Sequence, residues 1–149
     1  MEYRHSFLVH RDAAAVRAFH EDPEALAAIT PPPVRVTCLT APGRPAAGDE
    51  LAFVLQVGPL RVPWRARIET VDETGFTDRQ IEGPFREWAH RHEFVALDES
   101  ATLVRDTVTF HICTRPRRAL LGVAMAVGLP LLFRYRARRT RRLLEGMRG

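Results

Sequence analysis

The sequence predicts an α+β fold in which an antiparallel sheet packs against one long C-terminal helix. The expected elements follow the order strand, two short helices, a run of strands and one helix, and strands joined by short turns form an antiparallel meander. Such a sheet needs cover for its apolar face, and only the C-terminal helix is large enough to provide it. At 149 residues we expect a single domain that spans residues 1–149.

The first elements are predicted from alternation and from capping residues. Alternating side chains indicate a strand over residues 3–9. Asp12 can cap a short helix that runs through Phe19, and Asp22 followed by Pro23 starts a second helix over residues 23–29. The three prolines at positions 31–33 end this second helix.

The remaining strands are predicted from period-two patterns that are separated by turn residues. They are expected at residues 34–39, 51–57, 60–71, 76–82, 85–97 and 102–112. The turn after residue 71 ends at Gly75, where we expect a positive φ. The last helix is expected from about residue 117 to residue 144, because arginines near its end complement the helix dipole.

The composition is that of a globular protein with a real core. Hydrophobic residues make up 46% of the chain and charged residues 27%, which argues against disorder. All 22 basic residues are arginine, and the net charge is +4. Cys38 and Cys113 lack metal-ligand spacing, so we expect two buried, reduced thiols and a cytoplasmic protein. No signal peptide, Ser-His-Asp set, phosphate-binding glycine loop or CxxC pair is recognisable.

An apolar run covers residues 119–133 and is interrupted by Gly122, Gly128 and Pro130. It is shorter than the ~20 apolar residues that span a bilayer, so it predicts a buried helix or at most an interfacial one. Arginines flank this run on both sides and could make transient contact with an anionic membrane surface. They lack interleaved aromatic residues beyond Phe133 and Tyr135 and match no nucleic-acid module, so we expect no nucleic-acid binding.

The strand expected at residues 85–97 is the most informative part of the chain. Successive side chains of a strand point to opposite faces. One face carries Trp88, His90, His92 and Phe94. The other face carries Glu87, Ala89, Arg91 and Glu93, which is a solvent pattern. Two histidines are therefore expected to point inward together with two aromatic side chains, and buried imidazoles need hydrogen-bond partners.

The alternation of side chains along the neighbouring strands indicates which residues those partners are. We expect Asp106 to lie within hydrogen-bond or water-bridge reach of His92, and Asp78 within similar reach of His90, because the members of each pair share a face. The expected ligand-binding group combines this polar set with aromatic walls: Trp64, Asp78, Gln80, Trp88, His90, His92, Phe94, Asp106 and Phe110. The other histidines, His5, His10, His20 and His111, are expected at the surface.

Several sequence segments together resemble the START-like, or SRPBCC, superfamily of helix-grip proteins, of the polyketide cyclase/dehydrase and lipid-transport type. These segments are Ala18-Phe19-His20-Glu21-Asp22-Pro23, Pro31-Pro32, Phe76-x-Asp78-x-Gln80-x-x-Gly83-Pro84-Phe85-x-x-Trp88-x-His90-x-His92-x-Phe94, and Asp106 in the next strand. The resemblance implies a curved, seven-stranded antiparallel sheet around the C-terminal helix, with a cavity between them. It also implies hydrophobic ligands, such as lipids, sterols, polyketides or quinones, but no activity that transfers residue by residue.

The function that we expect is binding or transport of a hydrophobic small molecule whose polar end meets the Asp/His/Gln cluster. One alternative is a polyketide aromatase/cyclase or dehydratase, with His90, His92 and Asp106 as candidates for acid/base chemistry. A second alternative is a protein-interaction module whose core is filled and whose polar network only fixes strand register. His90 and His92 with Asp78 or Asp106 could also hold zinc or iron, but we expect neither a metal nor a cofactor.

Overall fold

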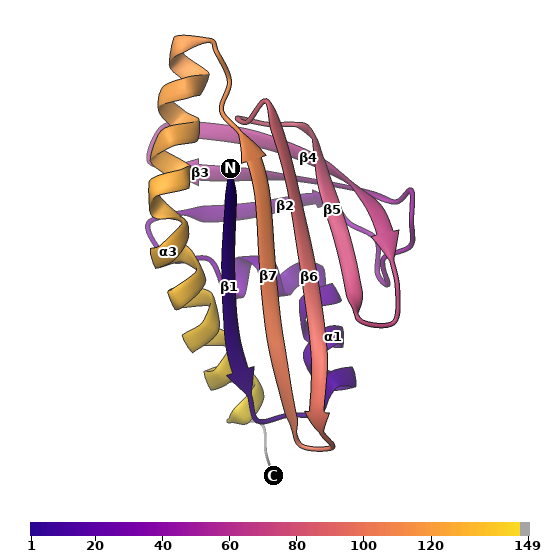
Figure 1. Ribbon diagram of the computed structural model, residues 1–149. Coiled ribbons are helices and arrows are strands. Elements are labelled where there is room, and N and C mark those ends of the chain that lie inside the picture. Colours follow the sequence, from indigo (N-terminus) through magenta and orange to yellow (C-terminus); the bar gives the residue numbers. More distant parts are fainter. Residues whose placement is uncertain (147–149) are drawn as a thin grey trace.

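The computed structural model describes residues 1–146, and these residues include a seven-stranded antiparallel sheet (Figure 1). The spatial order of the strands is β1-β7-β6-β5-β4-β3-β2. Their bounds are β1 Glu2–Val9, β2 Arg35–Thr40, β3 Glu50–Val57, β4 Leu60–Val71, β5 Gly75–Glu82, β6 Glu87–Asp98 and β7 Ala101–His111. Each predicted strand is confirmed to within two residues at either end. Figure 1 shows the sheet curving, so that β2, β3 and β4 run across the direction of β1, β7 and β6.

The described residues also form three helices, α1 Ala13–Glu21, α2 Pro23–Ala28 and α3 Pro116–Glu145. The predicted caps are confirmed: the Asp12 carboxylate accepts from the Ala15 N–H, and the Asp22 carboxylate accepts from the Glu24 N–H. Helix α3 lies along β1 (Figure 1). It continues through Pro130, whose side chain is exposed. The fold is therefore the predicted α+β helix-grip architecture.

Two apolar clusters lie between the sheet and the helices. The first cluster lies near the C-terminal end of α3 and consists of Phe7, Val9, Val16, Ile68, Phe76, Phe94, Val104, Ala137 and Leu144. The second cluster consists of Trp64, Ala66, Phe85, Trp88, Val108, Phe110, Leu129 and Phe133. Along β6 and β7, the residues between the two clusters are polar, and this gap positions the site described below.

Two predictions about burial were wrong. Cys38 is exposed, because β2 is the last strand of the sheet, and Cys113 is only half-buried after the end of β7. The apolar part of α3 is buried on one face only: Leu120, Val127 and Leu131 are 75%, 74% and 71% exposed, which contradicts the buried helix and leaves the interfacial alternative as a prediction. By length and composition α3 could cross a membrane, and only 17% of its most apolar window is buried.

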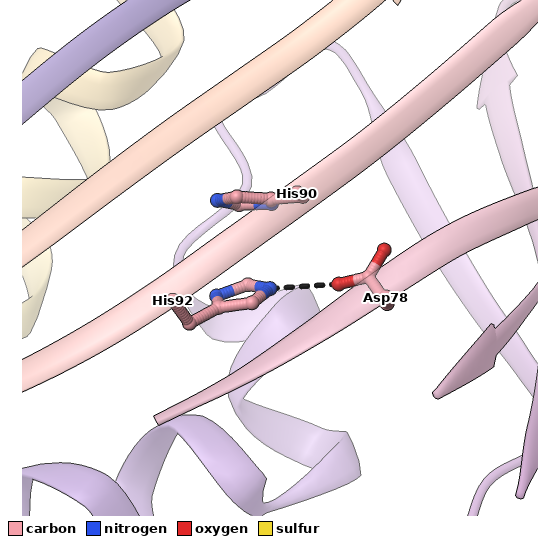
Figure 2. A group of neighbouring side chains, drawn as sticks. All are labelled: Asp78, His90 and His92. Carbon is pink, nitrogen blue, oxygen red and sulfur yellow. Dashed lines mark hydrogen bonds and ion pairs between the residues drawn. The ribbon is translucent and has the colours of Figure 1, made fainter. Parts of the chain in front are cut away.

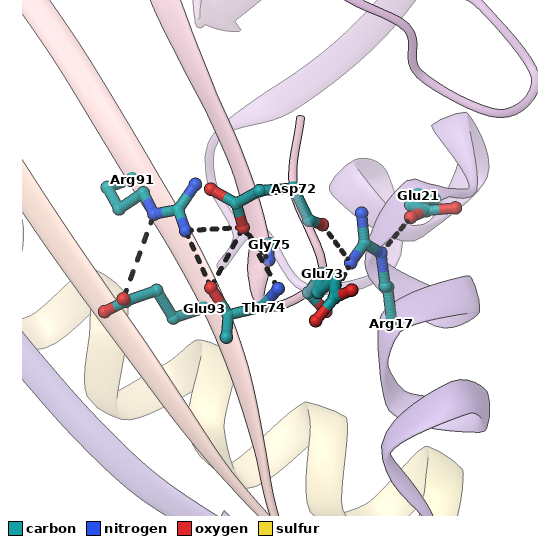
Figure 3. Close-up of polar contacts among 8 residues, drawn as sticks. All are labelled: Arg17, Glu21, Asp72, Glu73, Thr74, Gly75, Arg91 and Glu93. Atoms are coloured by element: carbon teal, nitrogen blue, oxygen red, sulfur yellow. Dashed lines mark hydrogen bonds and ion pairs between the residues drawn. The ribbon is translucent and has the colours of Figure 1, made fainter. Parts of the chain in front are cut away.

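Polar contacts on the outer side of the molecule fix the turn between β4 and β5 (Figure 3). The Arg17 guanidinium donates to the backbone carbonyls of Asp72 and Glu73 at 2.8 and 3.1 Å. The Arg91 guanidinium donates to the Asp72 carboxylate at 2.9 Å and to the Thr74 hydroxyl at 3.0 Å. Helix α1 and strand β6 are thereby tied to the same turn, which sets the start of β5.

Gly75, at the start of β5, is required for a reason other than the one predicted. Its φ is not positive; among the described glycines only Gly48 and Gly58 have positive φ. A Cβ at position 75 would instead lie 1.7 Å from the backbone oxygen of His92 on β6. The close approach of β5 to β6 therefore excludes any side chain at this position.

Replacing Gly75 by alanine should disturb the β5–β6 pairing, because the contacted atom belongs to the backbone and cannot rotate away. We expect Gly75→Ala to lower the free energy of unfolding by about 1–3 kcal/mol or more. Urea denaturation measures this loss. Gly43→Ala is the matched control, because a Cβ there meets nothing within 4 Å. Equal unfolding midpoints for the two variants would contradict the steric explanation.

Candidate functional site

A cavity of about 410 Å³ lies between the sheet and α3. Most of its wall is apolar and comes from the sheet, from α2 and the segment that follows it, and from α3. Four polar side chains from the middle of the sheet also line it, namely Asp78, His90, His92 and Asp106. Cys38 and Leu131 line the cavity and are exposed, so the cavity reaches the molecular surface.

The four polar residues form two short His–Asp pairs. His90 Nε2 lies 2.8 Å from Asp106 Oδ1, and His92 Nε2 lies 2.7 Å from Asp78 Oδ2. The two imidazole rings lie over one another, with 3.7 Å between their centroids and an interplanar angle of 31° (Figure 2). His92 Nδ1 is 3.8 Å from Asp106 Oδ1, so the Asp106 carboxylate interacts electrostatically with both imidazole rings.

The strand register is the predicted one, but the direct hydrogen bonds connect different partners. Asp78 lies opposite His90, and His92 lies opposite Asp106, as parity predicts. Each imidazole nevertheless bonds to the carboxylate diagonal to it. Diagonal neighbours in a sheet are within reach of long side chains, and this arrangement lets the two rings stack. The expected partners remain within water-bridge reach, because Asp106 Oδ1 lies 3.8 Å from His92 Nδ1 and a carboxylate oxygen of Asp78 lies within 4.8 Å of a ring nitrogen of His90.

Burial and hydrogen bonding set the protonation states in the cluster. Burial lowers the pKa of His90, and the charge of His92 lowers it further. Burial alone would raise the pKa of Asp106, but the hydrogen bond and charge of His90 hold it at about 2. Burial alone would also raise the pKa of Asp78, but the hydrogen bond from His92 leaves it below its ordinary value. An ionised Asp106 can only accept, so His90 donates its Nε2–H and keeps the lone pair on Nδ1.

Aromatic side chains hold the imidazoles in place. The Phe76 ring stacks on His92 with 4.4 Å between centroids and an angle of 21°. Phe133 from α3 meets His90 edge-on at 5.6 Å, and Trp88 meets the same ring edge-on at 6.5 Å. The cluster is therefore rigidly supported, and the two rings have little freedom to leave their carboxylates.

Most of the predicted inward-facing residues do face inward. Trp88, His90 and Phe94 are buried, His92 is half-buried, and Glu87 is exposed on the other face of β6. Of the expected ligand-binding group, those that line the cavity are Trp64, Asp78, Trp88, His90, His92 and Asp106.

The other three members of the expected group lie outside the cavity wall. Gln80 donates to the backbone oxygen of Phe85 at 2.8 Å and accepts from the Phe85 N–H at 3.3 Å. It therefore closes the β5–β6 connection instead of joining the polar cluster. Phe94 and Phe110 belong to the two apolar clusters.

The cavity residues that sequence reasoning missed include His20, Phe133 and Arg136. His20 was expected at the surface, but its Nδ1 lies 2.9 Å from the Val16 backbone oxygen and its ring packs 5.0 Å from that of Phe94. The spacing of His20 four residues after the buried Val16 was the signal that could have placed it inward. His5 is also half-buried, against Phe7 and Phe133, whereas His10 and His111 are exposed as expected.

The cluster also offers ligand atoms for a metal ion. Asp78, His90 and His92 could each supply one atom to a common centre. However, Nε2 of each histidine already lies within 2.8 Å of a carboxylate oxygen. A cation would have to replace these hydrogen bonds, so the arrangement fits a satisfied polar network better than a metal site. The expectation that no metal is bound stays a prediction.

The buried histidines predict a stability loss in mild acid. Burial lowers the pKa of His20 to about 4, despite the hydrogen bond to Val16 that raises it. An unfolded histidine titrates near 6.5, so the unfolded chain takes up this proton first as the pH falls. Stability should be complete above about pH 6.5 and decline toward pH 4, by up to roughly 3 kcal/mol from His20 alone.

Urea unfolding midpoints between pH 7.5 and 4 measure this dependence. His20→Gln should flatten the slope, because the substituted residue does not titrate. His111→Gln is the control, since that side chain is exposed and should leave the slope as in the wild type. A slope that is equally steep in His20→Gln would contradict the assignment.

Comparison with known proteins agrees with the observed architecture. No protein-family profile and no curated protein matches the sequence. Among solved structures, a START superfamily protein from Mycobacterium smegmatis aligns with a TM-score of 0.67 at 16% identity, over 95% of this chain and 98% of the other. The ZhuI aromatase/cyclase from Streptomyces sp. R1128 aligns with a TM-score of 0.65 at 18% identity, over 96% and 95%.

A plant enzyme structure is also similar. Norcoclaurine synthase from Thalictrum flavum, in complex with dopamine and hydroxybenzaldehyde, aligns with a TM-score of 0.68 at 15% identity. The alignment covers 100% of this chain and 88% of that one. Identities this low establish the fold alone. The predicted resemblance is confirmed at that level: the chain shares the helix-grip fold of these START-like structures.

Proposed function

We propose that this protein binds a hydrophobic small molecule, of the lipid, quinone or polyketide class, in the cavity between the sheet and α3. The observation that carries the proposal is an open, mainly apolar cavity with one buried polar cluster in its wall. Its volume of about 410 Å³ falls in the range of small-molecule sites. The apolar wall would supply affinity, and the His–Asp pairs would orient the ligand's polar end.

The structural neighbours support this ligand class. One neighbour is an aromatase/cyclase, and another is a synthase solved with two small aromatic molecules. The volume left in the cavity also disfavours the filled-core interaction module, because the protein's own side chains do not occupy that space.

Filling the cavity from α3 tests the proposal. Gly128 lines the cavity, and a Cβ there meets nothing within 4 Å. Gly128→Leu should therefore weaken binding of the apolar dye Nile red at least tenfold, as measured by fluorescence titration. The helix itself should tolerate the change, since glycine costs about 1 kcal/mol in a helix interior.

Gly128→Ala is the matched control, because it makes the same gain in helix propensity while adding one methyl group. It should bind the dye nearly as the wild type does. Unchanged dye binding in Gly128→Leu, or no dye binding by the wild type, would contradict ligand binding in this cavity.

Catalysis is a second candidate, favoured by one observation. The two stacked His–Asp pairs hold imidazoles with a defined tautomer beside an apolar space, which suits proton transfer at an enolisable carbonyl. Mass spectrometry of a polyketone incubated with the protein distinguishes the two candidates. Conversion of the compound that is lost in both His90→Ala and His92→Ala, with binding retained, would make the protein an enzyme of the cyclase or dehydratase kind.

We also propose that the exposed face of α3 rests on an anionic membrane surface. In the first half of the helix this face consists of Leu120, Val123, Val127 and Leu131, which recur every three or four residues. In the second half it continues with exposed Arg134, Arg138 and Arg142 at the same spacing. Leu131 also lines the cavity, so a ligand could pass between bilayer and cavity without crossing water.

The helix would lie on the membrane rather than cross it. Its opposite face is buried against the sheet through Leu129, Phe133 and Ala137, and crossing would expose that core. An apolar stripe beside a row of cations is the pattern of an interfacial helix, and arginine favours anionic lipids.

Vesicle flotation tests the membrane proposal. The protein should float with vesicles that contain phosphatidylglycerol and less with pure phosphatidylcholine vesicles, and added salt should weaken the association. The double variant Leu120→Asp, Val127→Asp should no longer float. Leu97→Asp is the control, because Leu97 is 57% exposed but lies at the end of β6. Flotation of the double variant at the wild-type level would refute the surface.

A further inference from the structure

Arg136 is a cavity residue that the His–Asp network leaves without a partner. It comes from α3, one turn after Phe133, and its side chain lines the cavity. Its Nε is buried and has no hydrogen-bond partner. Within residues 1–146, no hydrogen bond or ion pair joins its guanidinium to another side chain. Its guanidinium carbon lies over the Phe133 ring, 5.4 Å from the ring centroid.

An Arg136 guanidinium without a hydrogen-bond acceptor destabilises the fold unless another molecule supplies that acceptor. A guanidinium has five N–H donors and no acceptor, and a buried donor without a partner costs free energy. Burial lowers the pKa of Arg136, while the charges of Asp106 and Asp78 oppose that effect. Both carboxylates, however, already accept a short hydrogen bond from a histidine. The missing acceptor is therefore expected to come from the bound molecule.

The charges around the guanidinium restrict what that acceptor can be. The lowered pKa values of Asp78 and Asp106 keep both carboxylates ionised, so two negative charges already act on the single positive charge of Arg136. An anionic head group would add a third negative charge to the site. A cationic group would offer donors where acceptors are needed. A neutral oxygen acceptor satisfies Arg136 without changing the charge of the site.

We propose that Arg136 donates to a neutral carbonyl oxygen of the ligand, so that the cavity selects ketones, quinones or esters over hydrocarbons and over carboxylates. This inference rests on the proposed ligand binding and specifies its polar end. The Phe133 ring and the wall of α3 position the guanidinium, and the His–Asp pairs keep the two nearby carboxylates from capturing it.

A matched ligand series tests the inference. Decane, 2-decanone and decanoate differ only at one end, and each can be titrated against Nile red or followed through the fluorescence of Trp64 and Trp88, which line the cavity. For the wild type at pH 8 we expect 2-decanone to bind about tenfold more tightly than decane, since a hydrogen bond to a charged donor favours the ketone. Decanoate should bind more weakly than the ketone.

Arg136→Met should reduce the ketone-to-decane ratio to about one. It removes a half-buried charge whose Nε has no hydrogen-bond partner, so we expect the fold to be kept. Arg136→Lys, which keeps a charge but not the planar fork, provides a second variant. Arg134→Met is the control, because Arg134 lies on the exposed face of the same helix and should keep the wild-type ratio.

The outcomes separate this inference from the proposed function. Equal binding of decane and ketone by the wild type, tightest binding of decanoate, or a preserved ketone preference in Arg136→Met would overturn the role of Arg136 while ligand binding stands. Failure of the wild type to bind Nile red, decane and ketone alike would overturn both.

Discussion

The pairing of β5, β6 and β7 is the constraint on which the site depends. A slip of one residue would send His90 and His92 to the solvent face and leave Asp78 and Asp106 buried without partners. Gly75 fixes this register at the start of β5, where the backbones of β5 and β6 approach too closely for any side chain. Arg17 and Arg91 hold the turn just before it, so contacts on the outer surface fix the geometry inside.

The two His–Asp pairs allow two charged carboxylates to be buried beneath the sheet. Two carboxylates remain ionised because each accepts a hydrogen bond from a ring that is itself clamped by aromatic side chains. These bonds occupy one nitrogen of each imidazole and leave the carboxylates little capacity for other cations. The network is consequently both a support for the core and a polar wall for the cavity.

Helix α3 carries two different surfaces that meet at the cavity. Its inner face supplies Phe133 and Arg136 to the wall, and its outer face presents an apolar stripe followed by arginines. Leu131 belongs to both surfaces, since it is exposed and lines the cavity. A ligand with a hydrocarbon part that partitions into the bilayer and a carbonyl that accepts from Arg136 would match both the outer and the inner face of α3.

The sequence by itself determined the order of the elements, the caps at Asp12 and Asp22, and the inward face of β6, because alternation and capping are local properties. It also set the strand register, since a buried face permits only one parity. Only the tertiary structure decided which carboxylate each imidazole bonds, that His20 and Arg136 join the cavity, and that the apolar part of α3 is exposed. Those outcomes depend on where distant elements meet, and side-chain reach, ring stacking and the placement of α3 are not encoded in any one segment.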